Sequence, residues 1–179
     1  MTAVFREQAP SRPTDWCAVL VKIISGGQTG ADRAALDAAL GAGFPAGGYC
    51  PSGRMAEDGV IDSSYPLEEI DGGYSERTLM NVRVADATVA FHAGGLSGGT
   101  LQTVRFCREE QKPCLEIDLA RLDNAASIRA LADFVRTRDV RLLNVAGPRA
   151  SGSPEIYTRV RGVIAGLIAL VQGEGHLSG

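Results

Sequence analysis

The stretch that decides the fold is IISGGQTGADRAALDAALGAG, residues 23–43. It begins in an apolar, β-branched run, breaks into a glycine-rich corner, and resumes as an alanine- and leucine-rich segment with helical spacing. This order predicts a buried strand over 19–25, a tight loop, and a helix over 31–40 that is closed near Gly41 and Gly43. The glycines leave the backbone of this corner without side chains, which raises the question of which ligand would approach it so closely.

The same alternation of strand and helix continues along the chain. Further strands are predicted at 47–50, 87–92, 113–119 and 140–147. Helices are predicted over 75–86, with Ser75 as the cap, and over 100–111, 125–138 and 155–172. The polar stretch 50–73 is long for a connection and predicts a lid or a binding loop. Because parallel strands need a crossover, we expect a doubly wound, mostly parallel α/β sheet of the Rossmann-like kind, with helices on both faces.

Length and composition favour one soluble domain without a membrane or nucleic-acid partner. The 179 residues are 45% apolar and 22% charged, with a net charge of -3, which gives no general attraction to nucleic acid or to anionic membranes. The longest apolar runs are well short of the roughly 20 residues that cross a bilayer. No targeting segment is visible in the polar N-terminus, so we expect a cytoplasmic protein with a flexible leader over 1–16, a ligand-binding domain over 17–172 and a flexible tail over 173–179.

Cysteine and histidine spacing predicts neither a metal site nor a disulfide framework. The cysteines lack a CxxC pair and are expected to be free thiols: Cys17, Cys50, Cys107 and Cys114. Of these, only Cys50 lies in a Gly- and Pro-rich loop that suggests an accessible, reactive thiol. The histidines at 92 and 176 do not form a metal pair.

Three glycine-rich loops follow predicted strands and should meet at one edge of the sheet. They are SGGQTGAD (25–32), HAGGLSGGT (92–100) and NVAGPRASGSP (144–154). In a parallel sheet the carboxyl ends of the strands share an edge, where ligands bind. Two of the loops lead into a helix N-terminus, where unpaired amides and the helix dipole favour a phosphate. We therefore expect a phosphate-bearing small molecule, a nucleotide or a relative of one, with a plain turn as the alternative for SGGQTG, which lacks the Walker lysine.

Side chains near these loops complete the candidate site. Arg77 and Asn81 lie four apart on one helix face and could project toward the ligand, although a solvated face is the alternative. Asp32 sits in the first helical turn, where a carboxylate also favours the dipole. Arg33 and Arg149 could add positive charge. The candidate ligand-binding residues are Gly26, Gly27, Gln28, Thr29, Gly30, Asp32, Arg77, Asn81, Gly94, Gly95, Ser97, Gly98, Gly99, Thr100, Gly147, Arg149 and Ser151.

Several segments together resemble a known family. In order along residues 22–172 they are ISGGQTGADRAALDAAL, GYCPSGRMAEDG, ERTLMNVRVADATVAFHAGGLSGGTLQT and NVAGPRAS. They are similar to the molybdenum cofactor carrier family, part of a wider Rossmann-like group that includes the lonely-guy (lysine decarboxylase-like) phosphoribohydrolases. The resemblance implies binding and storage of the molybdenum cofactor, a pterin with a dithiolene and a terminal phosphate. It also implies a homo-oligomer, dimer or tetramer, and a molybdoenzyme as acceptor.

The hydrolase relatives carry an arginine before the strand and a PGGxGTxxE loop whose glutamate is catalytic. Arg77 matches the arginine, and the glycine loop matches with one residue inserted, but the glutamate position is Thr103. Threonine cannot supply the carboxylate that N-glycosidic cleavage needs, which favours a carrier over an enzyme. The alternatives are a nucleoside monophosphate hydrolase and a nucleotide-sensing module. In the hydrolase another acid would replace the glutamate: Asp32, Glu57, Asp58 or Asp86.

Overall fold

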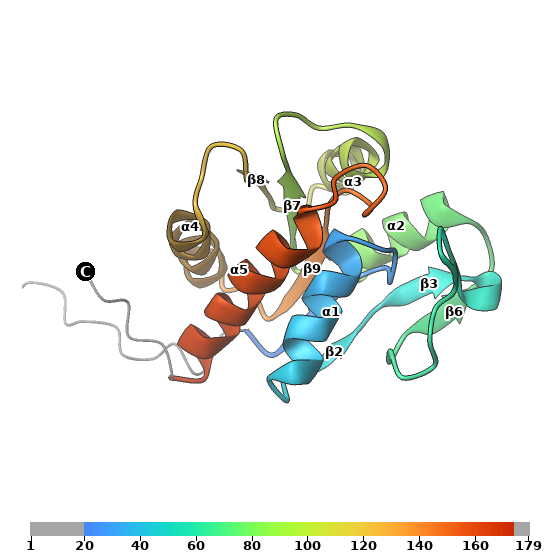
Figure 1. Ribbon diagram of the computed structural model, residues 1–179, viewed down its shortest axis with the longest axis horizontal. Helices are drawn as coiled ribbons and strands as arrows, with labels where there is room; N and C mark the ends of the chain where they lie inside the picture. The colour runs from blue at the N-terminus through green and yellow to red at the C-terminus, as the bar shows by residue number, and fades with distance from the viewer. Residues whose placement is uncertain (1–19, 174–179) are drawn as a thin grey trace, which may run out of the picture.

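A five-stranded parallel sheet forms the centre of the molecule (Figure 1). The computed structural model describes residues 20–173, so the predicted leader and all but the first residue of the predicted tail lie outside the described part. The strands lie in the order β2-β1-β9-β7-β8, and every neighbouring pair is parallel. They are β1 (Lys22–Ile24), β2 (Ala46–Gly47), β7 (Ala87–His92), β8 (Cys114–Asp118) and β9 (Leu142–Ala146). The predicted α/β class is confirmed.

Helices cover both faces of this sheet (Figure 1). On one face lie α1 (Ala31–Gly41), α4 (Asn124–Thr137) and α5 (Ile156–Val171), and on the other α2 (Tyr74–Val84) and α3 (Gly98–Glu109). The main core lies under α1, α4 and α5, where Phe91 and Leu143 of the strands pack with Leu167 of α5, all fully buried. None of the described helices is long and apolar enough to cross a membrane.

The polar stretch 50–73 folds as part of a small ordered lobe. In it β3 (Tyr49–Pro51) pairs with β6 (Glu68–Ile70), η2 (Ser52–Arg54) follows β3, and β4 (Met55–Ala56) forms a hairpin with β5 (Gly59–Val60). Its apolar residues pack against Leu36 of α1. The Arg54 guanidinium donates to four carbonyls of the lobe, at Ile61, Asp62, Tyr65 and Leu67. The sequence-based expectation of a lid or a binding loop did not include this second, smaller core.

Tertiary packing also changes several local expectations. Cys50 is fully buried in the small lobe, not accessible as expected, and burial raises the pKa of its thiol. The cap of α2 is not Ser75: the helix starts at Tyr74, and Glu76 accepts the Gly73 amide at 2.9 Å. Leu79, which the helical pattern would place in the core, is only partly buried.

Candidate functional site

The three glycine-rich loops meet in a cavity of about 470 Å³ at the carboxyl edge of the sheet. They meet because β1, β9 and β7 are consecutive neighbours, so the loops that follow these strands lie side by side. Helices α2 and α3 complete the wall. The lining includes many of the predicted residues: Gln28, Asp32, Arg77, Gly95, Ser97, Gly98, Gly99, Thr100, Gly147, Arg149 and Ser151. Sequence reasoning missed others, above all Tyr74, Gln102 and Ser153.

Most glycines of the first loop serve close packing instead of lining the cavity. A Cβ on Gly26 would lie 1.4 Å from Nη1 of Arg77, so this glycine makes room for the guanidinium. Gly30 has φ 78°, and a Cβ there would lie 2.4 Å from the Pro148 carbonyl oxygen. The predicted residues outside the lining are Gly26, Gly27, Thr29, Gly30, Asn81 and Gly94.

The side chain of Asn81 joins α2 to the small lobe and does not line the cavity. Its Oδ1 accepts the Tyr49 amide at 2.9 Å, and its Nδ2 donates to the Tyr49 carbonyl at 3.0 Å. Asn81 and Arg77 do lie on the same face of α2, as predicted. The small lobe, however, covers that face at Asn81. The sequence gave no sign of this contact, because the residues lie 32 positions apart.

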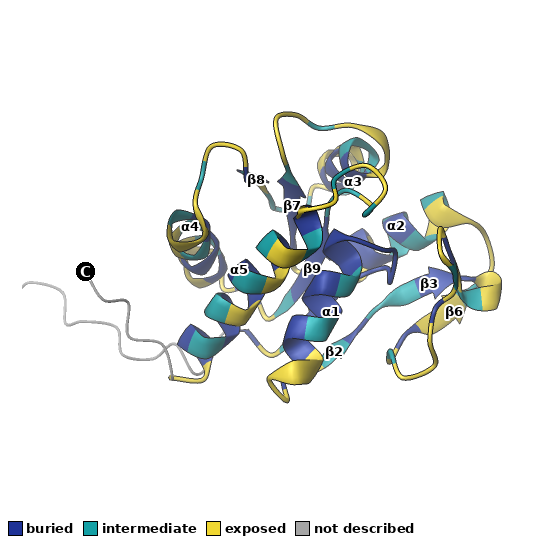
Figure 2. Ribbon diagram, in the orientation of Figure 1, coloured by how far each residue is buried: buried dark blue, intermediate teal, exposed yellow. Residues whose placement is uncertain are grey.

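The N-terminus of α1 is closed to a ligand by the protein itself. The Ala31 amide donates to the Pro148 carbonyl at 3.1 Å, and the Arg33 amide donates to the Gln28 carbonyl at 3.1 Å. Figure 2 shows this end of α1 as buried. The third glycine loop, which supplies Pro148, thus takes the position that the sequence suggested for a phosphate.

The N-terminus of α3 is open. Residues 97–99 are exposed, as is most of the loop above β7 in Figure 2, and 97–100 line the cavity. The first amides of a helix have no intrahelical acceptor, and the dipole makes this end positive. A Cβ on Gly98 or Gly99 would meet no atom of the described residues within 4 Å, so there is open space beside this turn. Asp118, which the sequence reading missed, accepts the Gly94 amide at 3.0 Å and holds the start of this loop.

A buried ion pair forms the floor of the cavity. Arg77 Nη1 lies 2.9 Å from Asp32 Oδ2, and the Gln28 amide donates to the same oxygen at 3.3 Å. Burial raises the pKa of the Asp32 carboxyl, and the neighbouring Arg77 charge acts in the opposite direction. Fixing Arg77 in this way leaves its Nε buried, without an acceptor among the residues that the structure describes.

Gln28 presents a second unused donor. Its Oε1 accepts the amides of Thr29 at 3.1 Å and Glu57 at 2.9 Å, which fixes the orientation of the side-chain amide. Its Nε2 is therefore left as a donor, and within the described chain it is buried with no acceptor. Buried polar groups are nearly always hydrogen-bonded, yet two of the side chains that line this cavity each carry a buried donor without an acceptor in the described chain.

Comparison with known proteins gives the family. The sequence model described as the circularly permutated YpsA SLOG family matches residues 23–168. The chain belongs to this SLOG family. It is also similar to the crystal structure of a protein described as "Putative molybdenum carrier protein" from Syntrophus aciditrophicus SB, with 41% identity, 84% of this chain and 96% of that chain covered, and a TM-score of 0.82. No curated protein matches the sequence. The family resemblance expected from the sequence is confirmed.

The rim of the SLOG cavity carries an aromatic ring and a cation. The Arg149 guanidinium lies over the Tyr74 ring, 5.0 Å from its centroid, which joins the third loop to the start of α2. Thr103, at the position of the hydrolase glutamate, donates to the Gly99 carbonyl at 2.9 Å. It therefore helps to hold the first turn of α3 and brings no ionisable group to the cavity.

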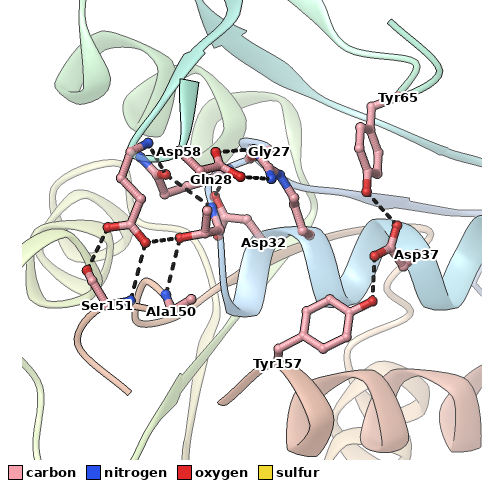
Figure 3. Close-up of polar contacts among 12 residues, drawn as sticks. Gly27, Gln28, Asp32, Asp37, Asp58, Tyr65, Ala150, Ser151 and Tyr157 are labelled. Carbon is pink, nitrogen blue, oxygen red and sulfur yellow. Dashed lines mark hydrogen bonds and ion pairs between the residues drawn. The ribbon is translucent and has the colours of Figure 1, made fainter. Parts of the chain in front are cut away.

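Of the four acids considered as substitutes for that glutamate, only Asp32 lines the SLOG cavity. Asp86 precedes β7 at the opposite edge of the sheet, where its Oδ2 accepts the amides of residues 141 and 142. Asp58 forms an ion pair with Arg33 outside the cavity. Glu57 contacts the back of the third loop (Figure 3). The described residues contain no group of three or more His, Cys, Asp or Glu that could hold a metal.

Proposed function

We propose that this protein is a carrier that binds the molybdenum cofactor in the SLOG cavity. The observation that supports this most is the combination of an open helix N-terminus with two buried, unused donors around one space. The volume of about 470 Å³ falls in the range of small-molecule sites. The name of the similar protein, a molybdenum carrier, supports the same ligand class.

The phosphate of the ligand would lie at the start of α3. Amides of the first helical turn and the Ser97 and Thr100 hydroxyl groups are the available donors there. Gly98 and Gly99 keep this turn free of side-chain atoms, so a phosphate can approach the backbone closely. Arg149 at the rim would add a positive charge.

The heterocycle would lie over the floor of the cavity. A pterin carries ring nitrogens and a keto oxygen, which can accept hydrogen bonds from the Gln28 and Arg77 side chains of the lining. Tyr74 and Arg149 present flat faces at the rim, and flat faces suit a planar ring. When bound, the cofactor's dithiolene would supply the metal ligands, since the described chain offers no metal cluster of its own.

The residues that line the cavity fit a storage protein better than they fit an enzyme. The only acid of the lining, Asp32, already accepts hydrogen bonds from Arg77 and from the Gln28 amide. Its position nevertheless keeps nucleoside monophosphate hydrolysis as the second candidate, with Asp32 as the acid. Replacement of Asp32 by Asn would then abolish release of base, whereas a carrier shows no such release at all.

A pterin assay tests the proposal. The protein is purified from cells that make the cofactor, denatured and oxidised, and the fluorescence of the oxidised pterin is measured per chain. We expect a substantial fraction for the wild type and a strong loss for Gly99→Val, with Gly41→Val as the matched control, because Gly41 lies outside the cavity and a Cβ there would also meet nothing within 4 Å. Absence of pterin, even after incubation with cofactor-rich extract, would reject the carrier function.

We also propose that the carrier is a homo-oligomer, a dimer or tetramer, and that it delivers its ligand to a molybdoenzyme. Light scattering after size exclusion gives the oligomeric state directly. A single species at the mass of one chain, 18.8 kDa, would reject the first proposal. Failure to activate a cofactor-free molybdoenzyme on mixing would reject the second.

A further inference from the structure

Two free cysteines lie next to each other at the end of α3. Cys107 belongs to the last turn of this helix and is fully buried, whereas Cys114 is the first residue of β8 and is only partly buried. Their thiols are hydrogen-bonded to each other and form no disulfide. The cavity takes its α3 residues from the other end of the helix, positions 98–103, so this dithiol lies apart from the cavity.

The backbone on both sides holds the two cysteines in place. The Lys112 amide donates to the Cys107 carbonyl at 2.8 Å, which fixes the turn that follows the helix. Gln111 within this turn has φ 54°, the left-handed conformation that commonly ends a helix. Cys114 then pairs in register with Thr88 of β7. Because both cysteines belong to ordered backbone, their sulfurs stay within reach of each other.

A buried threonine supplies a second donor to Cys107. Thr88 is fully buried, and its Oγ1 accepts a hydrogen bond from Asn144 Nδ2 at 3.2 Å, which leaves its hydroxyl hydrogen for the Cys107 sulfur. The hydrogen bond from Cys114 and then that from Thr88 lower the pKa of the Cys107 thiol, although burial opposes them. The pKa of the Cys114 thiol is raised in turn, because its proton is held in the shared hydrogen bond. Loss of one proton therefore leaves a thiolate and a thiol in contact, and the thiolate is the reactive form of cysteine.

We propose that Cys107 and Cys114 are a redox-active dithiol: hydrogen peroxide converts the pair into a disulfide that ties the last turn of α3 to β8, and a reducing thiol opens it again. The inference does not rest on the proposed function, because the dithiol lies outside the cavity. Peroxide first meets the partly exposed sulfur of Cys114, since Cys107 has no exposed surface. Cys107 is then the second sulfur, already in place when the first has been oxidised.

The reaction takes two steps. Transfer of the shared proton to Cys107 makes Cys114 the thiolate, which attacks one oxygen of the peroxide. The O–O bond breaks, Cys114 becomes a sulfenic acid, and the hydroxide that leaves takes the proton of Cys107 and becomes water. The Cys107 thiolate attacks the Cys114 sulfur, the S–O bond breaks, and the second hydroxide takes a proton from solvent. Two electrons pass from the sulfurs to the peroxide, which ends as two water molecules.

Peptide mapping of the full-length, reduced protein after exposure to hydrogen peroxide tests the inference. Trypsin cleaves after Arg105, Arg108 and Arg121, so the two cysteines fall on separate peptides, 106–108 and 109–121. A disulfide joins these peptides into one species whose mass is the sum of both less two hydrogens. We expect this species to be the main cysteine product of the native wild type and to disappear after treatment with dithiothreitol.

Serine variants test the order of the two steps. In Cys107→Ser the sulfenic acid at Cys114 has no partner, so we expect it to persist and to be trapped by dimedone, a reagent for sulfenic acids. In Cys114→Ser we expect the Cys107 thiol to stay unmodified, because it is buried. Cys50→Ser, the matched control at another fully buried thiol, should give as much linked peptide as the wild type. Circular dichroism establishes that each variant is folded before it is oxidised.

The result for the wild type decides the inference even if a variant does not fold. Thiols that remain unmodified in the native protein, at a peroxide concentration that fully oxidises free glutathione, would overturn it. A Cys114 sulfinic acid without a link, or a link from Cys114 to any other cysteine, would overturn it as well. None of these results bears on the carrier proposal, which the pterin assay tests separately.

Discussion

Replacing Gly26 by Ala should separate the buried ion pair between Arg77 and Asp32 and so reveal what the pair contributes to the free energy of unfolding. The new Cβ would lie 1.4 Å from Arg77 Nη1 and 2.3 Å from Cζ, so the guanidinium must move. Because it is the end of a flexible side chain, the steric cost is small. The main loss is that of the partner of Asp32, whose side chain is only 6% exposed. Leaving a buried charge unpaired costs about 3–5 kcal/mol, and this is the expected fall in the free energy of unfolding.

The loss of stability in Gly26→Ala should also depend on pH. Burial raises the folded-state pKa of Asp32 above its ordinary value of 3.8, so the folded protein binds more protons than the unfolded chain between the two pKa values. Stability therefore falls as the pH rises through this window. Displacing Arg77 raises the pKa further and extends the window upward, so the deficit of Gly26→Ala should be larger at about pH 8 than at about pH 5.

Urea unfolding of four proteins measures this effect: the wild type, Gly26→Ala, Asp32→Asn and the double variant. In the Asp32→Asn background the ion pair is already absent, so displacing Arg77 loses at most its hydrogen bond and Gly26→Ala should cost no more than about 1.5 kcal/mol, the value of one neutral hydrogen bond. The same cost in both backgrounds, independent of pH, would show that the glycine is needed for a reason other than the ion pair.

Further expectations follow from the same structure. Gly99→Val should change the free energy of unfolding by less than about 1 kcal/mol, because its Cβ meets nothing within 4 Å, yet weaken GMP binding at least tenfold by calorimetry; full affinity would contradict the site. Asp118→Ala should weaken GMP binding severalfold by freeing the start of the loop over β7, and an unchanged dissociation constant would remove Asp118 from the site. Leu143→Ala should cost about 2–5 kcal/mol in urea unfolding, and Leu79→Ala clearly less, because Leu143 is fully buried and Leu79 is not. Cys50 should resist a thiol reagent until the protein unfolds; peptide mapping that shows rapid labelling of the native protein would contradict its burial.

The alternation of elements could be predicted from the sequence because it depends on local patterns. Strands 87–92 and 113–119 and the helices after 125 and 155 were each predicted to within a few residues of the observed bounds. Hydrophobic periodicity records which side of an element is buried, and parallel strands then place the following loops at one edge. For that reason the meeting of the three glycine loops also followed from the sequence alone.

Burial in the small lobe could not be predicted in this way. A loop with Gly, Pro and charged residues looked exposed, yet Cys50 is fully enclosed, because strands β3 and β6 pair across 16 intervening residues and pack on α1. The four carbonyls that Arg54 binds lie up to 13 positions away. Such contacts depend on how the chain returns on itself, and no local pattern encodes them.

The sequence by itself therefore determined the fold class and the edge of the sheet at which the three glycine loops meet. It kept both 25–32 and 92–100 as candidate anion loops, with a plain turn as the alternative for 25–32, because both lead from a strand into a helix. The tertiary structure distinguishes the two: the Pro148 carbonyl accepts the Ala31 amide at the start of α1, while within residues 20–173 a Cβ on Gly98 or Gly99 at the start of α3 would meet nothing within 4 Å. The contact between Glu57 and Ser151 could not be predicted for the same reason, because the two residues lie 94 positions apart and only the folded chain brings them together.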